Sequence, residues 1–318
     1  MRYFITGCAG FIGSSLTDKL LQAGHEVVGY DNFSTGQVEF LNEAKKSPHF
    51  TLVQADLMDR DTLTKAMKNI DFVFHMAANA DVRFGTNHPH KDLEQNAIAT
   101  FHVLEAMRAN NVSRIAFSST GSIYGESQVI PTPESAPFPV QTSLYGASKL
   151  AAEGMIQAYC EGFNFQSYIF RFVSILGERY THGHVFDFYK QLLEDPSKLT
   201  ILGNGKQRKS YLYIQDCLDA MMFAIEHAKD KINIFNLGTN EYCEVNNSID
   251  WICNYLNVTP EKTYTGGERG WIGDNPFIFL DTARIRELGW KPKLSIQEGI
   301  MQTIKYLKEN TWVLEQRA

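Results

Sequence analysis

The residues best suited to chemistry in this 318-residue chain lie between positions 118 and 149. Tyr145 and Lys149 are four residues apart, so on a helix their side chains occupy the same face. A free tyrosine has a pKa of about 10. A lysine ammonium nearby would lower that pKa, and Tyr145 could then take or return a proton on a substrate hydroxyl. Together with the short hydroxyl side chain of Thr120, this pair predicts an oxidoreductase-type site.

A glycine-rich turn near the N-terminus must position a second reactant. Gly7, Gly10 and Gly13 follow an apolar segment, residues 3–6, and open a segment with helical spacing, residues 11–23. Strand, glycine turn and helix are the context of a dinucleotide-binding fingerprint. The glycines let the backbone approach a pyrophosphate, and the helix N-terminus supplies amide donors. The turn therefore predicts a dinucleotide cofactor.

The end of the next predicted strand, residues 26–30, indicates which dinucleotide this is. Asp31 follows it directly, at the place where an acidic side chain bonds the hydroxyls of the adenosine ribose. A carboxylate there repels the 2′-phosphate of NADP, and residues 32–36 contain no arginine to offset it. The sequence favours NAD over NADP.

Strands and helices alternate through the first half of the chain. Besides the two strands already named, the pattern predicts strands at 50–54, 71–75, 114–118 and 166–171, with helices at 91–110 and 145–161. Six strands alternating with helices predict an α/β fold with a doubly wound parallel sheet of the Rossmann type. Thr120 follows the fifth strand, at the edge where such sheets bind ligands. The small side chains of Ala77 and Ala78 would let a cofactor pass close to the backbone.

From about residue 172 the pattern becomes irregular, with short predicted helices and strands. We expect a Rossmann domain over residues 1–171 that carries the catalytic residues. A smaller α/β substrate-binding domain is expected over residues 172–318, and the two can be interleaved. The chain is long enough for one large or two ordinary domains.

Composition and charge narrow the class of function. The net charge is −6 and charged residues make up 21%, so binding to nucleic acid is not expected. No apolar run approaches the roughly 18 residues of a membrane helix, and the first residues lead into a strand rather than a signal peptide. The five cysteines are scattered, and neither the pair His88/His90 nor the pair His182/His184 is joined by a cysteine or an acid at ligand spacing. We therefore expect reduced thiols, no metal site, no membrane partner and a cytoplasmic location.

Five motifs together resemble the extended short-chain dehydrogenase/reductase family, and within it the nucleotide-sugar epimerase/dehydratase branch. The motifs are residues 7–13, 31–32, 118–125, 145–149 and 203–211. The resemblance extends from Arg2 to about Leu307. Since the last motif lies outside the predicted cofactor domain, the set is specific for the nucleotide-sugar branch, in which the substrate binds between the two domains.

The resemblance implies a role for each matching residue. Thr120 would bond the reacting sugar oxygen, Tyr145 would accept and donate the proton, and Lys149 would hold the nicotinamide ribose. The residues implied in NAD binding are Gly7, Gly10, Phe11, Ile12, Gly13, Asp31, Asn32, Asp56, Leu57, Ala77, Ala78, Asn96, Ser118, Tyr145 and Lys149. Those implied in substrate binding are Ser122, Ser174, Lys209 and Arg269.

Three of the substrate residues depart from the family pattern. Ser174 stands where many relatives have an asparagine, and 2-epimerases that act on CDP-sugars also carry serine there. Lys209 replaces the usual arginine of a diphosphate clamp and is less suited to bidentate binding. The basic run around it could also be a solvated turn. Arg269 precedes Asp274 with extra residues relative to the family, so its match is the weaker one.

The activity that the resemblance implies is NAD-dependent 4-epimerisation of a nucleotide sugar of the UDP-glucose/UDP-galactose type, through a transient 4-keto intermediate. Gly121 and Ser122 stand where the 4,6-dehydratases carry an Asp–Glu pair, so dehydration is not expected. Alternatives from the same first oxidation are UDP-glucuronate decarboxylation or 4-epimerisation, and 2-epimerisation of a CDP-sugar. A catalytically silent NAD-sensing regulator is the alternative from another class, although such proteins often lack the tyrosine or lysine. The family also implies a homodimer through the helices at 91–110 and 145–161.

Overall fold

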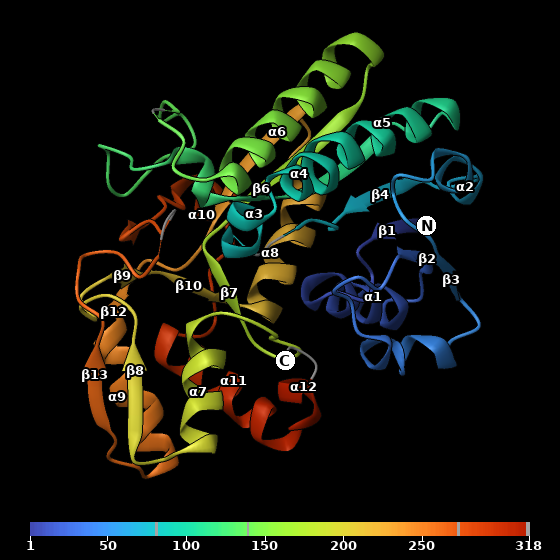
Figure 1. The fold of residues 1–318 in the computed structure, drawn as a ribbon. Coiled ribbons are helices and arrows are strands. Elements are labelled where there is room, and N and C mark those ends of the chain that lie inside the picture. The colour runs from blue at the N-terminus through green and yellow to red at the C-terminus, as the bar shows by residue number, and fades with distance from the viewer. Residues whose placement is uncertain (80–81, 139, 272–273, 316–318) are drawn as a thin grey trace. The chain divides into compact units, whose positions relative to one another are not determined.

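The computed structural model describes residues 1–79, 82–138, 140–271 and 274–315. A seven-stranded sheet has the strand order β11-β6-β5-β4-β1-β2-β3 (Figure 1). The pairs β1–β2, β2–β3, β1–β4 and β4–β5 run parallel. The strands are β1 (Arg2–Thr6), β2 (Glu26–Asp31), β3 (Phe50–Gln54), β4 (Phe72–His75), β5 (Arg114–Thr120), β6 (Gln166–Phe172) and β11 (Ile232–Leu237). The predicted doubly wound sheet is confirmed.

Helices connect these strands, and the two long helices α5 and α6 lie side by side (Figure 1). The helical elements of this part are α1 (Phe11–Gln22), η1 (Val38–Leu41), η2 (Ala44–Lys46), α2 (Arg60–Ala66), α3 (Val82–Asn87), α4 (Pro89–Asp92), η3 (Leu93–Ile98), α5 (Ala99–Ala109), η4 (Gly121–Tyr124) and α6 (Leu144–Phe163). The helix predicted at 91–110 is present, but a π-helical turn, η3, interrupts it.

Alternate residues of the strands bury both faces of the sheet, as a doubly wound fold requires. On one face, Phe4 and Ile115 pack in a core with Val103 of α5 and Ile156 of α6. The neighbouring strand positions form an aromatic cluster that includes Tyr3, Phe72, Phe74 and Tyr168. The near-continuous apolar runs of β1 and β4 follow from this burial on both sides.

The sequence analysis missed the seventh strand. β11 lies beyond residue 171 in the chain and follows helix α8 (Ile214–His227). It extends the sheet beside β6, where the Ser167 amide donates to the Lys231 carbonyl oxygen at 2.9 Å. A local apolar pattern does not reveal a strand's partner more than sixty residues away, so this segment fell within the predicted second domain, residues 172–318.

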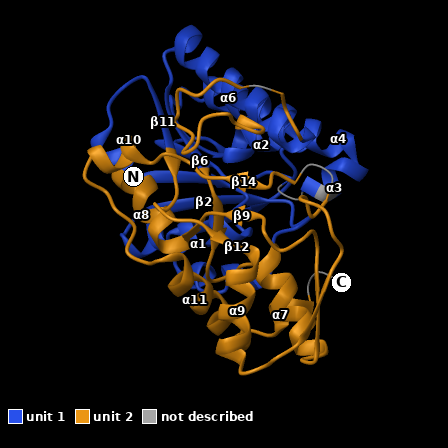
Figure 2. Ribbon diagram, turned by 90° about the vertical axis from the view of Figure 1, so that its left-hand side faces the viewer, with its two compact units in different colours: residues 1–123, 143–171, 224–235 blue, residues 124–142, 172–223, 236–318 orange. Residues whose placement is uncertain are grey.

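Contacts within the chain divide it into two compact units (Figure 2). Unit 1 comprises residues 1–123, 143–171 and 224–235, and unit 2 comprises residues 124–142, 172–223 and 236–318. The chain crosses between the units several times, once between Arg171 and Phe172. Helix α8 contributes its first part to unit 2 and its last turn to unit 1.

Unit 2 combines small sheets with amphipathic helices, of which α7, α9 and α11 pack against one another. β7 and β10 form one parallel pair, β8 and β13 another, and β12, β9 and β14 form a three-stranded sheet. The remaining elements are β7 (Ser174–Leu176), α7 (His184–Glu194), β8 (Lys198–Ile201), β9 (Arg208–Lys209), β10 (Tyr211–Tyr213), β12 (Cys243–Glu244), α9 (Val245–Leu256), β13 (Glu261–Tyr264), β14 (Phe277–Ile278), α10 (Ala283–Glu287), α11 (Ile296–Glu309) and α12 (Trp312–Glu315). Among all the described helices, none is both long and apolar enough to cross a bilayer.

Candidate active site

Helix α6 carries Tyr145 and Lys149 in its first two turns. Ser143 is its N-cap residue, and the Ser143 hydroxyl oxygen accepts a hydrogen bond from the Gly146 amide at 3.0 Å. Such a cap satisfies one of the free amides at the helix start and defines where the helix begins. The pair therefore occupies a well-fixed turn, and the i, i+4 spacing puts both side chains on one face.

The Lys149 ammonium is buried in unit 1 without a hydrogen-bond acceptor. The side chain is 1% exposed, and its Nζ atom lies 4.1 Å from the ring centroid of Phe117. Burial lowers the pKa of Lys149 to about 7, although the charge of Glu153 acts to raise it. An acceptor beside Nζ would satisfy this ammonium, and the ribose hydroxyls of a nicotinamide nucleotide fit that requirement.

The predicted effect of Lys149 on Tyr145 is wrong for the protein chain alone. The pKa of Tyr145 is raised to about 12, mainly because burial disfavours the phenolate. The hydrogen bond with Thr120 lowers this pKa and the charge of Asp92 raises it further. The sequence analysis assumed a fully charged lysine, but burial disfavours the ammonium of Lys149 as well.

Thr120 and Ser122 lie at the end of β5 and the start of η4. The Thr120 hydroxyl donates to Ser122 Oγ at 3.2 Å and accepts from the Ser122 amide at 3.1 Å. Since Thr120 also bonds Tyr145, the structure brings three of the predicted residues together in one hydrogen-bonded group. Each of these three residues is partly exposed, so a substrate could reach this group.

The glycine turn forms a cradle that leaves no room for side chains. Gly7 has a φ of +69°, and a Cβ atom there would lie 2.8 Å from the backbone of Ala77. A Cβ atom on Gly13 would lie 2.0 Å from the Gly7 carbonyl oxygen. Gly10 is the N-cap of α1, whose first-turn amides have no partner within the helix. A pyrophosphate fits this cradle, because it accepts hydrogen bonds from amides at a helix N-terminus.

Asp31, Asn32 and Asp56 meet at the ends of β2 and β3. Asp31 is 8% exposed, and its carboxylate accepts hydrogen bonds from the amides of Ala9 at 2.9 Å and Phe33 at 2.8 Å. Burial raises the pKa of Asp31, while these two amides lower it. Asn32 donates to Asp56 Oδ2 at 2.7 Å. Asp31 thus holds the glycine turn in place through the Ala9 amide.

Asn96 lies in the π-helical turn η3, a feature that often marks functional sites. Its side-chain oxygen accepts from the Asn79 amide at 2.9 Å, and its nitrogen donates to Ser148 Oγ at 2.9 Å. The Asn79 side chain in turn donates to Asp92 Oδ1 at 2.8 Å. The Asn96 side chain, predicted to lie near the nicotinamide, is 1% exposed. Its hydrogen bonds link the loop after β4 to α6.

The other predicted cofactor residues occupy three environments. Phe11 and Ile12 are partly exposed in the first turn of α1, and Ala77 and Ala78 are partly exposed after β4. The Ser118 hydroxyl donates to the His75 carbonyl oxygen at 3.3 Å. The side chain of Leu57 is 5% exposed and belongs to the hydrophobic core. Only the backbone of Leu57 could therefore take part in a ligand contact.

Sequence reasoning missed a buried polar group behind Tyr145 and Lys149. Glu153 follows Lys149 by one helical turn and pairs with Arg171 at 2.7 Å, and both side chains are almost fully buried. The Ser119 hydroxyl also donates to Glu153. The spacing of four residues between Lys149 and Glu153 is visible in the sequence. The partners of Glu153, Ser119 on β5 and Arg171 on β6, could not be predicted from it.

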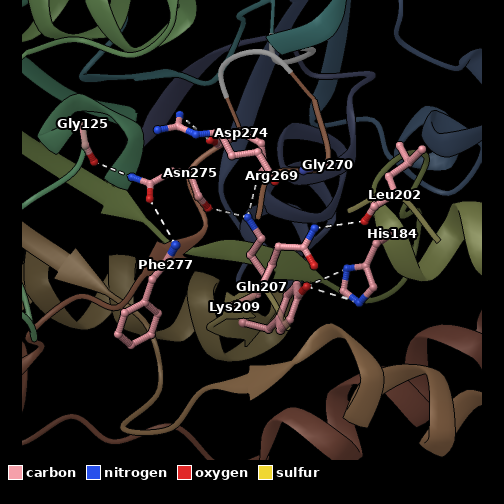
Figure 3. A network of polar contacts seen from close by, with 11 residues as sticks. Gly125, His184, Leu202, Gln207, Lys209, Arg269, Gly270, Asp274, Asn275 and Phe277 are labelled. Carbon is pink, nitrogen blue, oxygen red and sulfur yellow. Dashed lines mark hydrogen bonds and ion pairs between the residues drawn. The ribbon is translucent and has the colours of Figure 1, made fainter. Parts of the chain in front are cut away.

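In unit 2, Lys209 and Arg269 meet around Asp274 (Figure 3). Lys209 Nζ lies 2.7 Å from Asp274 Oδ1 and 2.7 Å from the Asn275 carbonyl oxygen. Arg269 donates to the Asp274 carbonyl oxygen at 3.3 Å and pairs with Glu126. Both predicted cations therefore have acidic partners within unit 2.

Ser174 does not join this network of polar contacts. It opens β7, where it pairs in register with Tyr211 of β10, and its side chain is exposed. The hydroxyl of Tyr211 bonds His184 Nδ1 at 2.6 Å, at the start of α7. Burial and the charge of Lys209 lower the pKa of His184 to about 3, so this histidine is neutral near pH 7.

The parallel sheet, the glycine cradle, the acidic residue after β2 and the Tyr–Lys pair are together typical of nicotinamide nucleotide-dependent enzymes. The model of the NAD dependent epimerase/dehydratase family matches residues 3–238, which is most of the chain. The chain therefore belongs to this family.

Individual relatives span nearly the whole chain. The UDP-glucose 4-epimerase of Mycolicibacterium smegmatis is 31% identical, with 98% of this chain and 100% of the relative covered. A crystal structure of a UDP-galactose 4-epimerase is 35% identical and superposes with a TM-score of 0.88, covering 98% and 100% of the two chains. The UDP-glucuronic acid 4-epimerase of Bacillus cereus, solved with UDP-glucuronic acid and NAD, is 26% identical with a TM-score of 0.89, covering 97% and 99%.

Proposed function

We propose that this protein is an NAD-dependent nucleotide-sugar 4-epimerase of the UDP-glucose/UDP-galactose type. The observation that carries the proposal is the hydrogen-bonded pair of Thr120 and Tyr145, with the buried ammonium of Lys149 one turn further along α6 and lacking an acceptor. A proton-transfer group, an orienting hydroxyl and a ribose-binding cation are the parts that such chemistry needs. The UDP-glucose and UDP-galactose 4-epimerases among the relatives support this substrate class.

Each residue of this group has a defined task in the proposed reaction. NAD, when bound, takes the hydride from carbon 4 of the sugar and returns it to the opposite face. Tyr145 takes the proton of the 4-hydroxyl as the keto sugar forms and returns it afterwards. Thr120 holds the reacting oxygen beside Tyr145. Lys149, once its ammonium is hydrogen-bonded to the ribose, lowers the Tyr145 pKa that burial alone raises.

For the substrate diphosphate we propose Arg269 and Lys209 as the cations. The Arg269–Glu126 pair is nearly half exposed on both sides, and such pairs are worth about 0–1 kcal/mol. Arg269 can therefore exchange Glu126 for a phosphate at little cost. The Lys209–Asp274 pair is mostly buried, so Lys209 would keep Asp274 while it contacts the ligand. We propose Ser122 and Ser174 as further substrate contacts, from hydroxyls that are at least partly exposed.

A second candidate is the 4-epimerisation of UDP-glucuronate. The Bacillus cereus enzyme of that activity superposes as well as the UDP-galactose 4-epimerase does. Decarboxylation of UDP-glucuronate and 2-epimerisation of a CDP-sugar begin with the same oxidation and use the same catalytic group. A silent NAD-sensing regulator is disfavoured, because such proteins often lack the tyrosine or the lysine, whereas Thr120, Tyr145 and Lys149 are all present in this chain.

The test is incubation of the purified protein with UDP-glucose, UDP-galactose, UDP-glucuronate and a CDP-sugar, each with and without added NAD, followed by proton NMR. We expect UDP-glucose and UDP-galactose to interconvert, and the couplings to show inversion at carbon 4. Release of carbon dioxide from UDP-glucuronate, or inversion at carbon 2, would replace the proposal with the corresponding alternative. No turnover of any of the four by protein with NAD bound would refute it.

We also propose a cytoplasmic homodimer that pairs α5 and α6 of two chains. Large apolar side chains are exposed on these helices and on η3, among them Leu93, Phe101, Leu144 and Phe163. Pairing would remove them from water. All five cysteines are free, which fits a reducing compartment. Sedimentation velocity at micromolar concentration tests the dimer, and a single species of about 36 kDa would contradict it.

A further inference from the structure

A fully buried carboxylate connects three elements behind the catalytic pair. Glu153 of α6 is 0% exposed, and Arg171 of β6 is 2% exposed. Arg171 reaches both carboxylate oxygens, with Nη2 2.7 Å from Oε2 and Nε 3.1 Å from Oε1. The Ser119 hydroxyl of β5 donates to the same Oε1 atom. Burying an ion pair costs a great deal of solvation, so its presence here calls for an explanation beyond packing.

The contacts of Glu153 lead directly to the catalytic residues on two elements. On α6, Glu153 follows Lys149 by four residues, which puts both side chains on one helix face with Cβ atoms about 5–6 Å apart. On β5, the bonded residue Ser119 immediately precedes Thr120. The carboxylate therefore fixes the end of β5 relative to the first turns of α6, where Thr120 must meet Tyr145.

We propose that Glu153 is a positioning residue for the catalytic group. Glu153 sets the distance between β5 and α6, and it supplies the negative charge that keeps Lys149 an ammonium. The inference rests on the proposed function only in that Lys149 is taken to act as a cation. Glu153 itself touches neither the reacting atoms nor the cofactor in this scheme. It acts through Lys149 and Ser119.

Two buried carboxylates lie near the helix face of Tyr145 and Lys149: the charge of Asp92 acts on Tyr145, and the charge of Glu153 acts on Lys149. Tyr145 is neutral near pH 7, and so is His75 of β4, whose pKa is lowered to about 3. Arg171 carries a positive charge, but it lies on β6 and is bound to the carboxylate, whereas Glu153 shares the helix face of Lys149. Burial drives the ammonium towards its neutral form, and the Glu153 charge acts in the opposite direction.

The test compares two variants, because Glu153→Gln removes the buried carboxylate that pairs with Arg171 and can unfold the protein. In the double variant Glu153→Gln/Arg171→Met both charges are removed, and the glutamine can still accept from Ser119. The first readout is NMR of protein labelled at the lysine Cε carbons, without nucleotide. The Lys149 signal, identified by its loss in Lys149→Met, is followed as the pH is changed.

We expect the Lys149 titration midpoint to lie near 7 in the unchanged protein and at least about one pH unit lower in the double variant. With NAD and UDP-glucose, the alkaline limb of kcat, which reports the complex, should also move to lower pH by about one unit, so that kcat at a pH above that limb falls about tenfold while KM changes little. A folded double variant with an unchanged midpoint and an unchanged pH profile would overturn the proposal.

The control is Glu161→Gln, on the same helix two turns further along. Glu161 is exposed and pairs with Lys231 at 3.3 Å, so its removal should move neither the midpoint nor the profile. The NMR readout needs no substrate. If the midpoint shifts and no sugar nucleotide is converted, the proposed function fails while the role of Glu153 stands.

Discussion

Replacing Lys149 with methionine should stabilise the protein measured without nucleotides, although it removes a residue that the proposed reaction needs. The ammonium of Lys149 is 1% exposed and lacks an acceptor, and its pKa is lowered from 10.5 to about 7. A difference of 3.5 units at 1.36 kcal/mol each is worth about 5 kcal/mol. A methionine keeps most of the volume and packs well against the ring of Phe117.

The pH dependence of this gain follows from the direction of the shift. Below pH 7 Lys149 is protonated in both states, and the folded state bears the full cost of burying its charge. Between pH 7 and 10.5 the unfolded state binds more protons, so the stability of the unchanged protein rises with pH. We therefore expect the variant to be about 2 to 4 kcal/mol more stable at pH 7, and the difference to shrink towards zero at pH 10.

The assay is urea unfolding of both proteins at pH 6, 7, 8.5 and 10, followed by circular dichroism. A gain that is largest at low pH and has fallen below about 1 kcal/mol at pH 10 would support the burial argument. Equal stability at every pH, or a loss at pH 7, would refute it and mean that Lys149 reaches solvent or an acceptor. Because activity should be abolished in the same variant, the result would show stability given up for function.

Four further predictions concern three predicted site residues and the N-cap of α6. Tyr145→Phe should lower kcat by at least about 10²-fold with NAD still bound, measured by coupled assay and by fluorescence titration of NADH; near-normal kcat would contradict the role. Asp31→Ala should weaken NAD binding and reduce the preference for NAD over NADP. Calorimetry measures both Kd values, and an unchanged ratio of the two would argue against the role of Asp31. Arg269→Met should raise KM for UDP-glucose about tenfold with little change in kcat, whereas the matched Glu126→Gln should not raise it. Ser143→Ala should cost about 1 kcal/mol in urea unfolding through loss of the α6 cap, and no cost would mean that water replaces it.

Features that depend on neighbours in sequence could be predicted from the sequence. The glycine turn, the acidic residue after β2 and the Tyr145–Lys149 spacing each lie within a few residues, so their types and order indicate their local structure. The same holds for the strands of the first half, which the structure places within one or two residues of the predicted bounds. The family resemblance rests on these local motifs as well.

Features that depend on distance in space could not be predicted in this way. The strand β11, the partners of Lys209 and the links of Asn96 join residues far apart in the chain. The sequence by itself determined that a tyrosine and a lysine share a helix face beside a dinucleotide fold. Only the tertiary structure decided that Lys149 is buried against Phe117, with Glu153 and Arg171 behind it. The reason is that the free energy of an ammonium depends on its burial and on the charges around it in space, and not on spacing along the chain.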